Sequence, residues 1–147
     1  MRRTLLVAAI VLAAGCGPDD REAVLRSMRH TSTTYQLEVT PDVQPPRARE
    51  PIMYRIVVRD RRTRQPIENG EGRIFANNRE GARTWDGLTY GPELGTYYGR
   101  LSYTIDGEWA VAVQFRRDSL YPLERIDWMQ WVAPEQPLPR PPTPNDP

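Results

Sequence analysis

The fold of this chain is decided by residues 97–115, which read YYGRLSYTIDGEWAVAVQF. Large apolar side chains recur at alternate positions on both sides of Asp106-Gly107. They are Tyr97, Leu101, Tyr103 and Ile105 before it, and Trp109, Val111, Val113 and Phe115 after it. An apolar side chain at every second position is typical of a strand with one face in a core. The stretch therefore predicts two strands joined near Gly107.

The connection between these strands is expected to be longer than its sequence first indicates. Asp106-Gly107 is typical of a two-residue hairpin turn, which would pair Ile105 with Glu108. That register would turn Trp109 and Phe115 toward solvent, although burying each such side chain is worth about 1.5–3 kcal/mol. We therefore expect a three-residue connection or a bulge, with Gly107 in an unusual backbone conformation.

The same alternation extends over most of the chain. It recurs in four further segments, at residues 35–39, 52–58, 74–76 and 126–132. No stretch within this domain keeps a 3.6-residue period for three turns, which excludes a helical bundle. The sequence predicts an all-β fold, an immunoglobulin-like antiparallel sandwich of about seven strands over residues 33–132.

A family resemblance rests on the ends of the two strongest strands. Gly95-Thr96-Tyr97, followed by Gly107-Glu108-Trp109, resembles the ending of YtkA-like (FixH-like) domains. Residues 54–60 and Gln65-Pro66-Ile67 are similar to that family's second strand and the turn after it, although Arg64-Gln65 replaces its usual glycine. The resemblance covers residues 37–115, with Tyr97, Gly107 and Trp109 as core signature. It implies a sandwich outside the cytoplasmic membrane, often tethered and sometimes associated with copper handling or oxidase assembly.

The N-terminus predicts export and lipidation. Arg2 and Arg3 precede an apolar run at residues 5–12, and Ala-Ala-Gly then leads to Cys16. The run is shorter than the about 20 residues of a membrane span, so residues 1–15 are predicted to be a lipoprotein signal peptide. Cys16 is the single cysteine and cannot form an internal disulfide, whereas acyl chains on it would anchor the protein. The alternative is an ordinary signal peptide with an incidental cysteine.

Two segments flank the predicted domain. Residues 16–32 are expected to be a lipidated tether with a possible short helix through Arg29. Residues 133–147 contain seven prolines and are expected to be a disordered tail. The location predicted is the cell membrane or outer membrane, with the domain facing the periplasm or exterior.

Composition excludes several kinds of site. All 20 basic residues are arginine, which excludes Schiff-base and phosphate-loop lysines. Removal of Arg2 and Arg3 with the signal would lower the formal charge from +1 to −1, so no nucleic-acid partner is expected. Carboxylates available for paired acid-base chemistry occupy turns or solvent-facing positions. We expect no enzyme activity and no catalytic residue.

Soft metal donors are few. Cu(I) prefers thioether, thiolate and imidazole ligands, and the candidates besides the lipidated Cys16 are His30, Met28, Met53 and Met129. The first two lie in the expected tether, and the other two lie on different strands. The sequence therefore predicts no metal site and no cofactor, with His30 a solvated linker residue.

Two surfaces are candidates for partner binding. One is the basic run of Arg59, Arg61, Arg62 and Arg64 near an expected hairpin tip, where guanidinium groups could bind phosphate or carboxylate. Its alternative is a solvated turn whose charges keep a sheet edge from pairing.

The other surface lies on the last strand. Trp128 and Trp131 have opposite parity, so one faces the core, and Trp131 with Met129 could form an apolar patch for a partner. The alternative is that the proline-rich tail or the loop around Trp85 covers this patch.

These observations favour a non-catalytic, membrane-anchored lipoprotein that serves as a binding or accessory module of the cell envelope. Its partner is expected to be an envelope protein or component. The alternative role is a periplasmic copper-trafficking or oxidase-assembly accessory protein of the YtkA/FixH type.

Overall fold

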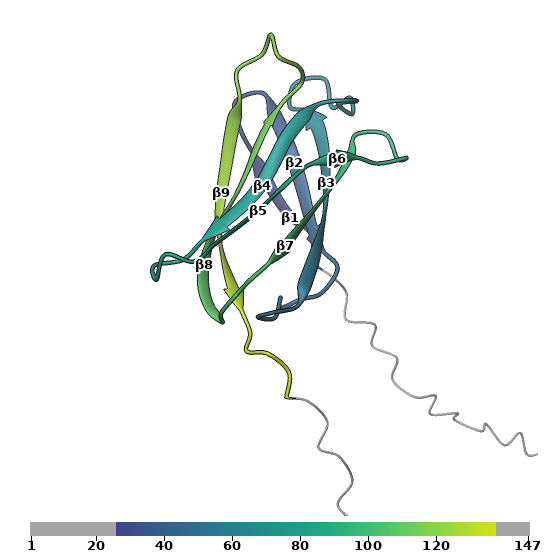
Figure 1. Cartoon of the computed structure of the whole chain (residues 1–147). Coiled ribbons are helices and arrows are strands. Elements are labelled where there is room, and N and C mark those ends of the chain that lie inside the picture. The colour runs from purple at the N-terminus through teal and green to yellow at the C-terminus, as the bar shows by residue number, and fades with distance from the viewer. Residues whose placement is uncertain (1–25, 138–147) are drawn as a thin grey trace, which may run out of the picture.

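A computed structural model describes residues 26–137, which form nine strands in two antiparallel sheets (Figure 1). The strands are β1 (Met28–Thr31), β2 (Tyr35–Pro41), β3 (Pro51–Asp60), β4 (Glu71–Asn77), β5 (Arg83–Gly87), β6 (Thr89–Tyr90), β7 (Thr96–Ser102), β8 (Gly107–Arg116) and β9 (Glu124–Val132). This part of the chain contains no helix, and so none that could cross a membrane.

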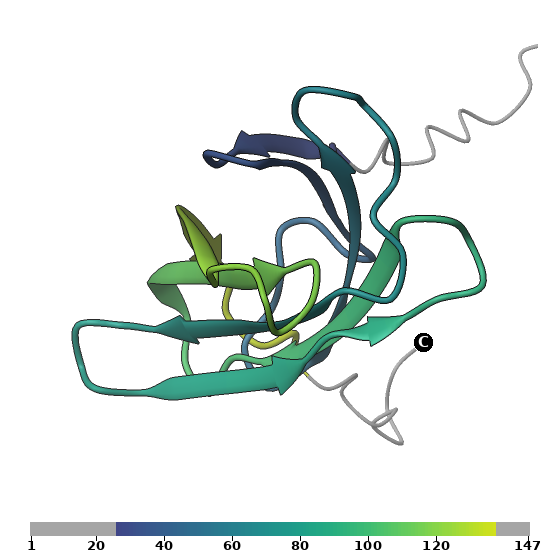
Figure 2. The same cartoon turned by 90° about the horizontal axis from the view of Figure 1, so that it is seen from above.

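The two sheets face each other as a sandwich (Figure 2). One has the order β1-β2-β3-β7-β6 and the other the order β5-β4-β8-β9. The seven strands β2-β3-β7-β6 and β4-β8-β9 follow the strand order of immunoglobulin domains. The predicted fold class is confirmed, and the strand count rises to nine because β1 extends one sheet and β5 extends the other.

The core lies between the inner faces of the sheets, as the alternation predicts. Trp109, Val111, Val113 and Phe115 on β8 are each at most 1% exposed. The Phe115 ring meets Tyr97 edge-on, with ring centroids 5.0 Å apart. Removal of these large side chains from water supplies the main driving force for the fold.

The connection between β7 and β8 is not the hairpin that the sequence predicts. These strands belong to different sheets, so residues 103–106 cross from one layer to the other. Gly107 has φ of 110°, a conformation that residues with a side chain rarely adopt. The Trp109 indole donates a hydrogen bond to the Ile105 carbonyl oxygen at 3.1 Å, which holds the crossing against the core. Periodicity identified the buried faces but not the sheet that each strand joins.

The sheet begins inside the segment expected to be a tether. Residues Met28–Thr31 form β1, and His30 pairs with Leu37 of β2, so the helix expected through Arg29 is absent from its described part. A short helix with a weak apolar face is marginal in water, whereas β1 completes its hydrogen bonds against β2. The predicted signal peptide, Cys16 and the rest of the tether up to residue 25 lie outside the described residues.

The chain enters and leaves the domain at the same end (Figure 1). The Arg26 amide donates to Gln44 Oε1 at 3.1 Å, in the connection between β2 and β3. Ala133 exchanges backbone hydrogen bonds with Pro46 and Ala48 in that connection, at 2.8 and 2.9 Å. The predicted tail is therefore held where it begins, and residues 138–147 lie outside the described range.

Candidate functional site

The outer face of β9 exposes two large apolar side chains. Met129 is 61% exposed and Trp131 is 57% exposed, whereas Trp128 faces the core and is 9% exposed. One tryptophan therefore faces the core and the other faces solvent, as their opposite parity predicts. Two large apolar side chains exposed next to each other on one strand make this face a candidate interaction site.

The register extends this patch across the sheet. Met129 pairs with Ala110, while Trp85 of β5 pairs with Phe75, which in turn pairs with Ala112. We call this surface the outer apolar face. Its members are Phe75, Trp85, Ala110, Ala112, Met129 and Trp131, of which Ala112 is covered by its neighbours and only 1% exposed.

Within residues 26–137, Trp131 is not covered by another segment and stays 57% exposed. Trp85 lies on β5, separated from β9 by two strands, which puts about 14 Å between the two strands at a spacing of about 4.8 Å. Trp85 is also level with Asp127, four residues along β9 from Trp131. Trp85 is itself 72% exposed. Cover by the loop around Trp85 is therefore wrong, and tail residues 134–137 leave the Trp131 ring open.

Charged groups frame the middle of this face. The guanidinium carbons of Arg73 and Arg125 lie 5.3 and 5.1 Å from the centre of the Phe75 ring. Arg125 also forms an ion pair with Asp127 at 2.5 Å. Stacked guanidinium groups shield Phe75, so apolar exposure concentrates at Met129, Trp131 and Trp85.

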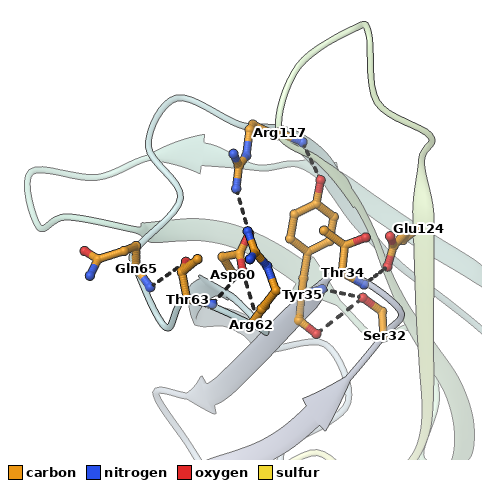
Figure 3. A network of polar contacts seen from close by, with 9 residues as sticks. All are labelled: Ser32, Thr34, Tyr35, Asp60, Arg62, Thr63, Gln65, Arg117 and Glu124. Atoms are coloured by element: carbon orange, nitrogen blue, oxygen red, sulfur yellow. Dashed lines mark hydrogen bonds and ion pairs between the residues drawn. The ribbon is translucent and has the colours of Figure 1, made fainter.

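The arginine run lies at the opposite end from the chain ends, where β3 leads into the connection to β4. The run occupies the tip of a short hairpin, as expected: the Asp60 amide donates to the Gln65 carbonyl oxygen at 2.8 Å, and Arg59 pairs antiparallel with Pro66. The chain then crosses to β4 in the other sheet. The Asp60 carboxylate accepts hydrogen bonds from the Arg62 and Thr63 amides, both at 2.9 Å, and pairs with Arg117 at 3.0 Å (Figure 3). The hydrogen bond from Thr63, followed by those from Arg62 and the charge of Arg117, lowers the pKa of Asp60 despite partial desolvation.

Three of the four guanidinium groups contact neutral oxygens instead of carboxylates. Arg59 and Arg61 donate to the carbonyl oxygens of Arg64 and Ser32 at 3.5 and 3.3 Å, and Arg64 donates to Gln36 Oε1. Their positive charge therefore remains available to an anion. The edge-protecting role is wrong, because Arg59 at the end of β3 pairs with Gln36 of β2 on one side and with Pro66 on the other.

A shallow groove of about 420 Å³ lies beside this run on the outer face of β1, β2 and β3. It is lined by Arg29, Gln36, Glu38, Val57, Arg59 and Arg64. Arg29 lies 3.7 Å from Glu38, which leaves Arg59 and Arg64 as the cations of the groove without a carboxylate in contact.

The same end of the sandwich is tied together by a second carboxylate. Glu124 at the start of β9 accepts a hydrogen bond from the Thr34 amide at 3.0 Å, and the Tyr35 hydroxyl accepts one from the Arg117 amide at 2.9 Å (Figure 3). Burial raises the pKa of Glu124, but hydrogen bonds from Ser32 and Thr34 outweigh it and lower the pKa overall. This network joins β1–β2 to β8–β9 and gives the end a defined shape.

His30 is not the solvated linker residue that the sequence predicts. It faces inward from β1 and stacks on Trp128, with ring centroids 5.1 Å apart and an interplanar angle of 26°. Burial lowers its pKa. His30 Nε2 and Trp128 Nε1 are both buried, and neither has a hydrogen-bond partner within residues 26–137. Met28 and His30 are alternate residues next to the pattern of β2, and this spacing was the signal that could have placed His30 in the sandwich.

The three core-signature residues have structural roles. The buried Tyr97 hydroxyl donates to the Ile67 carbonyl oxygen at 2.7 Å and accepts from the Gly70 amide at 2.9 Å. It thereby anchors the connection from β3 to β4, while Gly107 and Trp109 shape the connection from β7 to β8. Within residues 26–137, no three His, Cys, Asp or Glu side chains gather as a metal site.

Comparison with known proteins shows similarity in fold. No family model matches the sequence, and no curated protein matches it. A DUF4426 family protein from Pseudomonas aeruginosa superposes with a TM-score of 0.56 at 8% identity, over 75% of this chain and 97% of its own. FetP from uropathogenic E. coli strain F11 superposes with a TM-score of 0.51 at 10% identity, over 72% of this chain and 93% of its own.

A copper-bound variant of the same FetP also superposes, with a TM-score of 0.50 at 10% identity, over 80% of this chain and 96% of its own. At these identities the similarity establishes the sandwich fold alone. The resemblance to YtkA-like domains is thus supported at the level of an immunoglobulin-like fold and not as that particular family.

Proposed function

We propose that this protein is a non-catalytic binding module of the bacterial cell envelope, anchored through a lipidated Cys16, that docks an envelope protein on its outer apolar face. The observation that carries the proposal is the exposure of Met129 and Trp131 side by side on β9, at 61% and 57%. Each would gain on the order of 1 kcal/mol or more from burial against a partner. A binding role explains why a sandwich with a filled core keeps these side chains in water.

The surroundings of the patch support this role. Ala110 is the cross-strand neighbour of Met129, so the surface beside the thioether is shallow and accessible to an apolar side chain. Glu108 is the neighbour of Trp131, and Arg125 and Asp127 lie farther along β9. An apolar centre with tryptophan and a charged rim is the usual anatomy of a protein interface.

Photo-crosslinking tests this proposal in living cells. A photoreactive amino acid in place of Trp131 should give one discrete adduct with an envelope protein, and Met129→Asp in the same chain should abolish it. The matched control replaces Leu120, an apolar residue that is 91% exposed in the β8–β9 connection, away from the outer apolar face. The same adduct from both positions, or an adduct that survives Met129→Asp, would refute docking on this face.

A second candidate is a copper-handling accessory role. It is supported by the copper-bound FetP variant, which shares the fold. The copper ligands of FetP are not transferred to this chain by similarity in fold. This role therefore depends on whether this chain's own soft donors come together.

A further inference from the structure

The inner edge between β1 and β9 contains two polar atoms that the fold does not satisfy. His30 Nε2 and Trp128 Nε1 are buried without a hydrogen-bond partner in the described part of the chain. An unsatisfied buried donor or acceptor costs about 1–3 kcal/mol. Trp128 Nε1 is a hydrogen-bond donor that a cation cannot satisfy, whereas a neutral imidazole offers a lone pair, so His30 Nε2 is the atom that calls for a ligand.

A thioether lies on the same face of the same strand. Met28 and His30 are two residues apart on β1, so both point inward, and Met28 packs against the core. The contact of Thr34 with Glu124 and the stacking of His30 on Trp128 fix how β1 runs along β9. The next inward positions along the two strands are Met28 and Gln130, and Gln130 is buried.

The surroundings are apolar and carry no charge. The inward neighbours on β2 and β9 are Leu37, Val39, Ile126 and Gln130. The site therefore offers an imidazole nitrogen and a thioether sulfur, with no carboxylate to balance a divalent ion. This donor set disfavours hard divalent cations, which prefer oxygen ligands. Cu(I) is a soft ion that binds thioether and imidazole ligands and can be held by a small number of them.

We propose that Met28 and His30 bind one Cu(I) ion through Sδ and Nε2, beside the indole face of Trp128. The imidazole and indole planes are inclined by only 26°, so an ion in the imidazole plane lies alongside the indole face. The electron-rich indole face attracts a cation, and this attraction is stronger where water is excluded. The inference deepens the second candidate function and is independent of docking on the outer apolar face.

Anaerobic titration of the full chain with Cu(I) tests the site. All variants carry Cys16→Ser, so that no thiol competes for the ion. We expect one Cu(I) per chain, a change in tryptophan fluorescence, and a shift of the imidazole NMR signals, which belong to the only histidine of the chain. Met28→Leu and His30→Gln should each weaken binding by more than about 10-fold, because loss of a ligand costs at least as much as loss of a group that only orients one.

The matched controls are Met53→Leu and Met129→Leu, thioethers on outer faces, which should bind Cu(I) as tightly as the parent. Trp128→Phe should keep one-to-one binding but lose the fluorescence change. Binding that is unaffected by Met28→Leu and His30→Gln, or tighter for Zn²⁺ than for Cu(I), would overturn the proposal. The NMR arm needs no substitution at the site, so unchanged imidazole signals at saturating Cu(I) would overturn it even if a variant failed to fold.

This test separates the site from the role. A chain that binds Cu(I) at Met28 and His30 but leaves cellular copper handling unchanged when deleted would retain the site and refute the accessory function. A chain that does not bind Cu(I) at Met28 and His30, but whose deletion disturbs cellular copper handling, would refute the site and retain the accessory function.

Discussion

At the scale of single residues, two buried tyrosines from the same side of the core, Tyr54 on β3 and Tyr103 just after β7, share a hydrogen bond. The hydroxyl oxygens of Tyr54 and Tyr103 are 2.6 Å apart, and both residues are fully buried. Burial raises the pKa of Tyr54 to about 12, even though the hydrogen bond to Tyr103 lowers it, and burial also raises the pKa of Tyr103. Both groups therefore remain neutral, and each depends on the other for its hydrogen bond.

We predict that Tyr54→Phe or Tyr103→Phe alone lowers the free energy of unfolding by about 1–3 kcal/mol, because one buried hydroxyl is left without a partner. The double variant should lose less than the sum of the two, since it removes both hydroxyls together. Urea denaturation of the four proteins measures the coupling. Strict additivity would show that the hydroxyls do not depend on each other.

Asp60 gives a second prediction, on pH. Hydrogen bonds from the Thr63 and Arg62 amides and the charge of Arg117 lower its pKa from the ordinary value of 3.8. The folded chain then binds fewer protons here than the unfolded chain, so Asp60 contributes stability above about pH 4 that is lost as the pH falls through the lowered pKa. Asp60→Asn should flatten the acid side of the stability curve, measured by thermal unfolding between about pH 6 and about pH 3.

The comparison for this prediction is Arg117→Gln. It removes the partner cation but leaves both amide hydrogen bonds to Asp60, so the acid slope should decrease only in part. An Asp60→Asn curve parallel to that of the parent would contradict the assignment.

At the scale of elements, β7 approaches the opposite sheet closely at Gly99. A Cβ at this position would lie 2.6 Å from Ile74 Cγ2 on β4 and 3.0 Å from Leu88 Cδ2. Ile74 is fully buried, and its branched side chain cannot move away from the backbone of β4. The glycine thus lets the two sheets meet at the spacing that the core requires.

Gly99→Ala should destabilise the fold by about 1–3 kcal/mol through overpacking. The matched control is Gly87→Ala on β5, where an added Cβ meets nothing within 4 Å. Chemical denaturation of both variants tests the difference. Equal effects of the two substitutions would show that β-propensity, and not the approach of β7 to β4, sets the cost.

At the scale of the whole molecule, the chain ends and the arginine run lie at opposite ends of the sandwich (Figure 1). If Cys16 carries the anchor, the arginine run lies at the end of the domain far from the point where the tether enters it, and we expect its guanidinium groups to bind a phosphate or carboxylate of an envelope partner. The outer apolar face then lies along the side of the molecule.

Anchoring makes a prediction of its own. The parent protein should sediment with the membrane fraction, and Cys16→Ser should move it to the soluble fraction, because two or more acyl chains are needed for stable attachment. Trp131→Ser is the control and should stay with membranes. A Cys16→Ser protein that still sediments with membranes would contradict a lipid anchor at this residue.

Much of the fold was predictable from local pattern. The alternation in residues 97–115 identified the buried faces of β7 and β8, and the parity of Trp128 and Trp131 placed one in the core and one in water. The connection at Asp106-Gly107 was not predictable in the same way, because a turn signal does not say whether the next strand pairs or crosses to the other sheet. The inward His30 was missed because β1 is short and its pattern is visible only beside β2.

The sequence by itself determined the class of fold, the buried faces of the strands and the types of side chain available for a site. The spacing of apolar residues and the composition are local properties, which is why they can be read without the tertiary structure. The tertiary structure alone decided that β3 lies inside its sheet and that His30 stacks on Trp128 across 98 positions of sequence. It also decided that Trp85 and Trp131 share one outer face. The physical reason is that strand pairing and sheet packing join distant segments, and many pairings satisfy the same alternation equally well.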